Sequence, residues 1–437
     1  MIQQVAKRKT AALAVVLTAG LGLSACGGDA SEGGGDSAVD NFTVMSRWST
    51  GTPEYEALQT QVATFTDETG VDVEIIDGGE DIDVTFETAV AAGQAPDVIA
   101  VNLFDKSLGW LDAGVTVPAD DYVSEWGLED KISQEALLQW RQGQTEDGEL
   151  LGMPYSGFSW PVWFNTRLLS EAGVDEVPTT TDDLMAAVDA LKKAGTPPMI
   201  VGGGDWSGQK LFFQTIQSYL TPEQAQTLFA GGGYCDSAEA MKGIDLFVQM
   251  RDGGLFVDNV AGLTADNMNN TYFSQGAAMM PAGSWAFSPA VSADEESGEG
   301  VVEVTQLGGL PVPDDSALGE PSIYKAFTGV GFMLTPTGAE DDRIEASRAF
   351  IEGFYSEETT ADFVEKANLV PAVEGDFAEA SENPLLSEAL ELESVSNAVL
   401  PDVWIGTASE ALTQVSTLAY GGADAQKICS GLDSASN

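Results

Sequence analysis

The alternation of apolar and polar positions after residue 40 switches repeatedly between the period of a strand and the period of a helix. Residues 42–46 alternate as a strand, and residues 53–69 carry apolar side chains at helical spacing up to Gly70. Residues 71–76 alternate as a second strand, residues 85–92 show a helical pattern, and residues 95–101 read as a buried strand. This strand–helix order is typical of a parallel α/β sheet whose crossovers are helices.

The rest of the chain continues this mixture of patterns up to residue 419. Helical periodicity predicts helices over residues 181–194, 210–219, 222–230, 238–252, 343–355, 359–366 and 408–419. Short β-branched or apolar runs predict strands over residues 199–201, 301–310 and 329–334. The sequence has no internal repeat and no heptad array, so we predict one continuous α/β body after residue 40.

The first forty residues differ in composition from this body. Basic residues at 7–9 precede an apolar run over 11–23, which is too short for a stable membrane-spanning helix. The run ends in Leu23-Ser24-Ala25-Cys26, followed by a small, acidic tract. This segment resembles a bacterial lipoprotein signal, which implies cleavage before Cys26 and lipidation of Cys26; an ordinary secretory peptide is the alternative. We expect a signal peptide at 1–25 and a flexible tether at 26–40.

Charge and composition narrow the range of functions. The 437-residue chain has a formal net charge of −51 and no histidine. A chain this acidic is not expected to bind nucleic acid or an anionic membrane surface. Without histidine, it cannot build a Ser-His-Asp or Cys-His nucleophilic site or a His-ligated zinc site. We expect no catalytic residues, no metal and no cofactor.

Several short motifs follow one another in a fixed order along the chain. They occupy residues 65–73, 92–99, 148–156, 164–165 with 178–180, and 273–280 with 283–285. The ordered set resembles the family 1 extracellular solute-binding proteins of ABC importers and spans nearly the whole chain after the tether. Each motif is weak alone, so the resemblance rests on their order behind a lipoprotein-like signal.

The resemblance implies a two-lobe α/β fold of the type II periplasmic-binding-protein class. Each lobe would be a mainly parallel sheet flanked by helices, and the ligand cleft would lie between the lobes. Crossings between the lobes are expected near Met153, Met280 and Gly331. The N-terminal lobe would comprise residues 41–153 plus 278–330, and the C-terminal lobe residues 154–277 plus 331–437. A solute that contacts both lobes would favour the closed state.

Tryptophans are the first candidates for ligand contact, since flat aromatic faces suit the C–H surfaces of sugars. Trp285 follows Gly283-Ser284 and matches a sugar-stacking position of the family, and Trp404 matches a second one. Trp206 follows a strand and a glycine run, and Trp48 follows the first strand. For each of the four, packing in a hydrophobic core is the alternative.

Carboxylates and amides are the candidates for hydroxyl recognition. We expect this role for Glu54, Asn102, Asp105 and Asp205, with Ser49 and Thr50 as further contacts. Asn102 follows a predicted strand at the carboxyl edge, where α/β proteins collect ligands. Glu54 could equally stabilise the dipole at a helix N-terminus. Phe158 stands where a relative in the family has a carboxylate, so the site departs from that pattern.

The three cysteines are expected to differ in their chemical state. With Cys26 lipidated, Cys235 and Cys429 remain. A pair of cysteines in an exported protein suggests one disulfide, and two buried free thiols are the alternative.

The resemblance implies an extracytoplasmic receptor held at the outer face of a bacterial cell membrane by its lipid. We expect a monomer that captures a mono- or oligosaccharide and delivers it to the permease subunits of an ABC importer. The same fold could hold a polyol or a polyamine instead. A different class, a secreted carbohydrate-active enzyme with paired carboxylates, also stays open, because the chain has 69 acidic residues.

Overall fold

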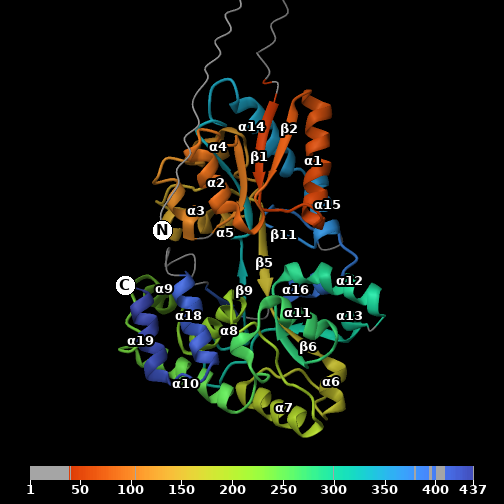
Figure 1. Cartoon of the computed structure of the whole chain (residues 1–437), viewed down its shortest axis with the longest axis vertical. Coiled ribbons are helices and arrows are strands. Elements are labelled where there is room, and N and C mark those ends of the chain that lie inside the picture. The colour runs from red at the N-terminus through yellow and green to blue at the C-terminus, as the bar shows by residue number, and fades with distance from the viewer. Residues whose placement is uncertain are drawn as a thin grey trace, which may run out of the picture. The chain divides into compact units, whose positions relative to one another are not determined.

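The structure of the protein is a computed structural model. It describes residue 39 and residues 41–103, 105–298, 300–377, 380–392, 396–399 and 409–436. The predicted signal peptide, Cys26 and Trp404 lie outside the described residues. Residues 38–437 form one compact unit, within which the helices and strands are arranged as two lobes (Figure 1).

The first lobe is built on a five-stranded sheet with the order β2-β1-β3-β10-β4. Strands β1 (Asn41–Ser46), β2 (Asp72–Asp77) and β3 (Val98–Asn102) run parallel, as the strand–helix order predicts. Strand β10 (Val330–Leu334) runs antiparallel between β3 and β4 (Met153–Pro154). All five residues of β10 are buried, because this strand lies in the interior of the sheet.

Helices cover the first-lobe sheet. They are α1 (Pro53–Thr69), η1 (Gly79–Asp81), α2 (Ile82–Ala91), α3 (Asp105–Trp110), α4 (Asp120–Glu125), α5 (Gln134–Gln139), η2 (Gln142–Gln144), α14 (Ile344–Phe354) and α15 (Glu357–Ala367). The hydroxyl of Thr52 caps the start of α1, and Gly70 ends it with a left-handed φ of 75°. Helix α1 packs against α14 and α15, so segments almost 300 residues apart share one core.

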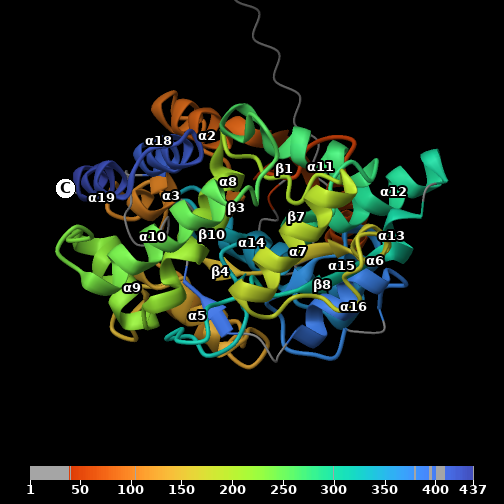
Figure 2. The same cartoon turned by 90° about the horizontal axis from the view of Figure 1, so that it is seen from below.

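The second lobe is mainly helical and contains a three-stranded sheet with the order β7-β6-β8. Its strands are β6 (Val162–Asn165), β7 (Met279–Pro281) and β8 (Thr305–Gly308). Its helices are α6 (Thr166–Glu171), α7 (Thr181–Ala194), α8 (Trp206–Ile216), η3 (Gln217–Tyr219), α9 (Pro222–Gly231), α10 (Ala238–Asp252), η4 (Val260–Gly262), α11 (Ala265–Phe273), η5 (Ser284–Ala286), α12 (Phe287–Ser297), α13 (Val301–Val304), α16 (Pro384–Glu391), α18 (Ser409–Tyr420) and α19 (Ala425–Ala435). Seen from below, α18 and α19 lie together on one side of this lobe and α12 and α13 on the other (Figure 2).

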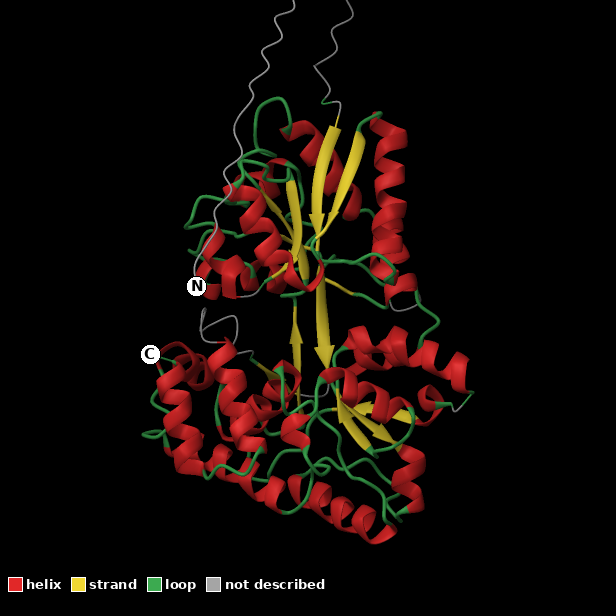
Figure 3. Ribbon diagram, viewed as in Figure 1, coloured by secondary structure: helices red, strands yellow, loops and turns green. Residues whose placement is uncertain are grey.

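A four-stranded sheet connects the two lobes. Its order is β11-β5-β9-β12, with β5 (Ser156–Trp160), β9 (Ser322–Ala326), β11 (Val370–Pro371) and β12 (Ser396–Ala398). Figure 3 shows that long strands pass between the lobes in this region. The chain therefore changes lobe between β4 and β5, again between β9 and β10, and a third time between α15 and α16, where β11 lies.

The structure differs from the expected lobe boundaries in two segments. Residues 278–330 were expected in the first lobe, but β7 and β8 pair with β6 in the second. Met280 is therefore not at a crossing. Residues 331–437 were expected in the second lobe, and α16, α18 and α19 do lie there. In contrast, β10 pairs with β3, and α14 and α15 pack on α1, so these elements belong to the first lobe. A fully apolar strand fits the interior of either sheet, so its own sequence does not reveal its partner.

The C-terminal helices are fastened to the second lobe by a disulfide between Cys235 and Cys429. The carboxylate of Asp433 accepts hydrogen bonds from the backbone N–H groups of Gly233, Tyr234 and Cys235, at 2.8, 2.7 and 3.3 Å. The hydroxyl of Tyr420 on α18 donates to the carbonyl of Gly208 on α8. Helix α18 therefore contacts α8 directly, and α19 is covalently linked to the segment between α9 and α10.

Within the part of the chain that the structure describes, no helix is both long enough and apolar enough to cross a membrane.

Candidate functional site

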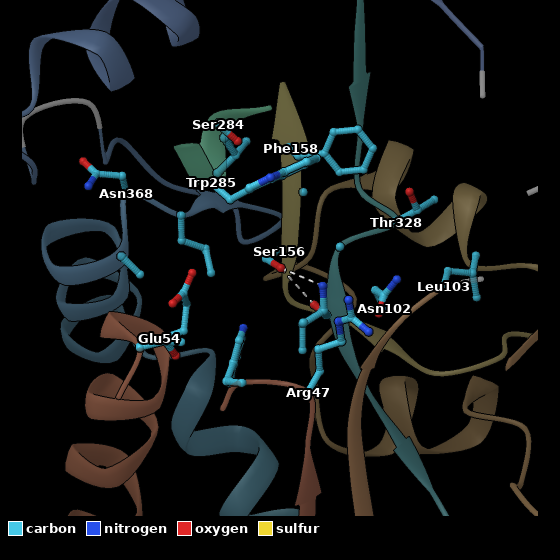
Figure 4. Close-up of a pocket in the computed structure, with 18 of the residues that line it drawn as sticks. Arg47, Glu54, Asn102, Leu103, Ser156, Phe158, Ser284, Trp285, Thr328 and Asn368 are labelled. Atoms are coloured by element: carbon cyan, nitrogen blue, oxygen red, sulfur yellow. Dashed lines mark hydrogen bonds between the residues drawn. The ribbon is translucent and has the colours of Figure 1, made fainter. Parts of the chain in front are cut away.

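A cavity of about 530 Å³ lies between the two lobes, within the size range of small-molecule sites (Figure 4). Its first-lobe lining consists of Arg47, Trp48, Ser49, Thr52, Glu54, Glu80, Asn102 and Leu103. Its second-lobe helices contribute Trp206, Gln209, Lys210, Ser284 and Trp285. The connecting segments add Ser156, Gly157, Phe158, Thr328, Gly329, Val330, Ala367, Asn368, Leu369 and Val370. The loops after β1 and β3 open into it, so it occupies the carboxyl edge of the first-lobe sheet.

Four rings on the second-lobe side form what we call the cavity aromatic cluster: Phe158, Trp160, Trp206 and Trp285. The ring centroids of Trp206 and Trp285 are 5.9 Å apart, and Trp160 lies 5.8 Å from the first and 5.2 Å from the second. Phe158 meets Trp285 edge-on at 5.5 Å. Trp160 is buried beneath, whereas Trp206 and Trp285 are 42% and 41% exposed. Of the described residues, these are the two aromatic side chains among the exposed large hydrophobics.

Local backbone features fix the two exposed indoles. Trp206 is the first residue of α8, and Trp285 lies in η5 directly after Ser284. A Cβ on Gly283 would lie only 2.4 Å from the Trp285 ring, so a glycine is needed for the indole to fold back over the chain. Trp206 and Trp285, two of the four predicted tryptophans, thus line the cavity, and their contact with a ligand stays a prediction.

Asp205 has a different role from the one predicted. Its side chain accepts hydrogen bonds from the backbone N–H of Ser207 at 2.9 Å and from the hydroxyl of Ser207 at 2.6 Å. Its other oxygen accepts from the backbone N–H of Ala265 at 2.7 Å. Asp205 is thus the N-cap of α8 and ties this helix to α11, while the cavity lining begins one residue later, at Trp206.

Five of the other predicted contacts divide into three groups. Trp48 and Ser49 line the cavity, but Trp48 is only 7% exposed and packs on Phe363 with a centroid distance of 4.9 Å. The backbone N–H of Thr50 donates to Asp77, and this hydrogen bond lowers the pKa of the Asp77 carboxyl. Asp105 begins α3, and its side chain, like all of Trp404, lies outside the described residues.

Glu54 and Asn102 stand on the wall opposite Trp285 (Figure 4). Burial raises the pKa of the Glu54 carboxyl, although its own backbone N–H and the Thr52 hydroxyl oppose the shift. The Oδ1 atom of Asn102 is buried and has no hydrogen-bond partner among the described residues. Both groups therefore present acceptor oxygens to the cavity.

The charges on the cavity wall are balanced, unlike those of the whole chain. The described lining residues include two cations, Arg47 and Lys210, and two carboxylates, Glu54 and Glu80, while the chain carries −51. Arg47 donates to Glu80 at 2.9 Å, and the Glu80 side chain is 90% exposed. An acidic surface thus surrounds a site without an excess of either sign.

Comparison with known protein families gives a match over most of the chain. Residues 48–361 match the family described as bacterial extracellular solute-binding protein. The chain belongs to this family. The resemblance of the ordered motifs and the two-lobe fold class are therefore confirmed.

Two individual relatives are informative about the extent of the similarity to this solute-binding protein. A probable sugar-binding periplasmic protein of Rhizobium meliloti (strain 1021) is 32% identical over 143 residues, which is 32% of this chain and 33% of the relative. The match thus spans about a third of the length of that curated relative. The crystal structure of a probable secreted solute-binding lipoprotein from Streptomyces coelicolor is 33% identical, covers 92% of this chain and 99% of its own, and has a TM-score of 0.81.

More distant structures share the fold of this solute-binding protein. A chitin oligosaccharide binding protein is 24% identical, covers 91% of this chain and 98% of its own, and has a TM-score of 0.77.

Several lining residues of this solute-binding protein were not predicted. Gln209, Lys210, Ser284, Thr328 and Asn368 reach the cavity from helices and connecting segments. Gln209 and Lys210 lie three and four residues after Trp206 on α8, so the spacing on a helix face would have identified them once Trp206 was taken as a contact. The others belong to no local pattern, because the lobes bring them together.

Proposed function

We propose that this protein is an extracytoplasmic receptor that captures a neutral mono- or oligosaccharide by closure of its lobes. The observation that carries the proposal is the pair of half-exposed indoles, Trp206 and Trp285, above the buried Trp160. Apolar ring faces of this kind suit the C–H surfaces of sugars, and polar groups on the opposite wall suit sugar hydroxyls. The names of the relatives, which include sugar-binding periplasmic proteins, support the same class of ligand.

The balanced charge of the cavity supports a neutral solute. A phosphorylated solute would need an excess of cations, and a polyamine an excess of carboxylates. The lining described here holds two residues of each sign. A glycoside hydrolase would need two carboxylates that flank one bond, whereas Glu80 is largely exposed and paired with Arg47.

We further propose that the receptor is held at the outer face of the cell membrane by a lipid on Cys26 and delivers its sugar to the permease of an ABC importer. The Leu23-Ser24-Ala25-Cys26 sequence supports the anchor. Replacement Cys26→Ser should shift the protein from the membrane fraction to the medium. If the variant protein fractionated with membranes as before, the anchor would be contradicted.

The test of sugar capture is a thermal-shift panel on residues 38–437, which form one compact unit. The panel contains maltose, maltotriose, xylobiose, chitobiose, sorbitol and spermidine. A sugar present at about 100 times its Kd should stabilise the protein by roughly 2.7 kcal/mol. The shift should disappear in Trp285→Ala and persist in Leu418→Ala, because Leu418 is 47% exposed on α18 and is not part of the described lining. A response to sorbitol or spermidine alone would overturn the sugar proposal.

A further inference from the structure

Gln209 is a buried amide that uses its oxygen but not its nitrogen. The side chain is 1% exposed and lines the cavity. Its Oε1 atom accepts a hydrogen bond from the hydroxyl of Thr413 on α18, at 2.8 Å. Its Nε2 atom is buried and has no partner among the residues that the structure describes. The Thr413 contact thus orients the amide so that its donor end is unused.

A second glutamine on the same stretch shows what a structural amide looks like. Gln217, in η3 directly after α8, is 2% exposed. Its Nε2 donates to the carbonyl of Val399 at 2.9 Å, and its Oε1 accepts from the backbone N–H of Val399 at 3.0 Å. Buried amides in folded proteins are normally satisfied in this way, because an unpaired buried donor destabilises the fold. Gln209 therefore calls for an explanation that Gln217 does not.

The position of Gln209 on α8 points to a ligand. Trp206 and Gln209 are three residues apart, so they occupy the same helix face, and both line the cavity. A sugar lying on the Trp206 ring would therefore present its edge oxygens towards the Gln209 amide.

We infer that Gln209 determines specificity by donating a hydrogen bond from Nε2 to an oxygen of the bound sugar, and that Thr413 positions it. This inference rests on the proposed function. Asn102 Oδ1 is the complementary unpaired acceptor on the first lobe. The two amides together require a ligand that both accepts and donates hydrogen bonds, as hydroxyl groups do. A fully protonated polyamine offers donors alone and cannot satisfy Gln209.

The test compares Gln209→Met with Gln217→Met in residues 38–437. Calorimetric titrations use maltose, maltotriose, xylobiose, chitobiose and spermidine, and melting temperatures are measured without ligand. Gln209→Met should weaken binding of the sugar that wild type binds by about tenfold, the effect of one hydrogen bond that leaves a buried oxygen unpaired. Its ligand-free melting temperature should be unchanged or higher. Gln217→Met should melt lower and keep the wild-type affinity.

The role of Thr413 is tested by a conservative pair. Thr413→Val removes the hydroxyl that fixes the amide and should weaken sugar binding. Thr413→Ser keeps the hydroxyl and should bind the sugar as tightly as wild type. If the substitutions only loosened α18, the two variants would bind the sugar equally tightly whenever their melting temperatures were equal.

Three outcomes overturn the inference. If Gln209→Met binds the sugar as tightly as wild type does, Gln209 makes no useful contact, although the receptor function stands. If spermidine binds wild type and no sugar does, the proposed function fails, and the inference falls with it. The same holds if wild type binds none of the five probes.

Discussion

Two aromatic clusters of this protein use similar ring contacts in different surroundings. The first-lobe aromatic core consists of Tyr155, Phe332, Phe354 and Phe363, all of which are fully buried. Its ring centroids are 4.5 to 5.8 Å apart, and those of the cavity aromatic cluster are 5.2 to 5.9 Å apart. Contact geometry therefore does not separate a core from a site; exposure of Trp206 and Trp285 does.

The protein is less stable with these two indoles exposed than it would be if they were buried. An indole buries roughly 200 Å² when it is covered, so leaving about 40% of it open forgoes about 2 kcal/mol. The first-lobe aromatic core has no such loss. The first cluster therefore stabilises the fold, whereas the exposed ring faces of the second are available to a ligand, as the proposed function requires.

The largest expected effect is on the stability of the protein when a ring is removed from the first-lobe aromatic core. Phe354→Ala removes a ring that lies 4.5 Å from Phe332 and 5.4 Å from Tyr155, and it should lower the free energy of unfolding by about 3–5 kcal/mol. Sugar affinity should change little under conditions where the variant is folded. Guanidinium unfolding measures the loss. A loss below about 1 kcal/mol would show that the two clusters do not differ as described.

A smaller effect, on sugar affinity, is expected when an extra methyl group is placed against the cavity aromatic cluster. Gly283 has φ −76° and ψ 161°, so alanine fits its backbone, but the new Cβ would meet the Trp285 ring. Gly283→Ala should displace the indole and weaken sugar binding by about tenfold, equivalent to roughly 1.4 kcal/mol. Titration calorimetry measures this change. Gly231→Ala is the matched control, because nothing lies within 4 Å of its Cβ, and it should bind like wild type.

The smallest effect concerns the polar wall that faces the aromatic cluster. Burial raises the pKa of the Glu54 carboxyl, so the folded state holds its proton to a higher pH than the unfolded state does. Stability attributable to Glu54 is therefore lost as pH rises above its ordinary pKa of about 4.3. The melting temperature of wild type relative to Glu54→Gln should therefore fall as the pH rises above about 4.3. A difference that rises with pH would contradict the burial of this carboxylate.

The parts of the fold that depend on local sequence could be predicted. Helix α7 was expected at its observed bounds, because Thr180 caps its start and Gly195 ends it with φ 80°. The lobe assignment of β10 could not be predicted, since its pairing with β3 joins segments more than 200 residues apart. Residues 301–304, expected as a strand, form α13, and β8 begins only at Thr305.

The residues of the candidate site also divide into those that could be predicted from the sequence and those that could not. Trp285 was predicted as a ligand contact from its position after Gly283-Ser284 and its match to a family position. The structure places it at the cavity, and its contact with a ligand stays a prediction. Asp205 was predicted as a ligand contact because carboxylates suit the hydroxyl groups of sugars, but the N-terminus of α8 and Ala265 use its carboxylate. Gln209 was missed, although it lies three residues after Trp206 on α8 and so shares its helix face. Its orientation could not be predicted, because it depends on Thr413, which lies 204 residues further along the chain.

The most direct test of the account is ¹⁹F NMR of the protein labelled with 5-fluorotryptophan. The chain has nine tryptophans, and single Trp→Phe variants would assign the resonances of Trp206, Trp285 and the buried Trp140 and Trp163. On saturation with the panel sugar that gives the largest thermal shift, the resonances of Trp206 and Trp285 should move, while those of Trp140 and Trp163 should stay. If the sugar binds and the resonances of Trp206 and Trp285 do not move, the exposed pair is not the sugar site.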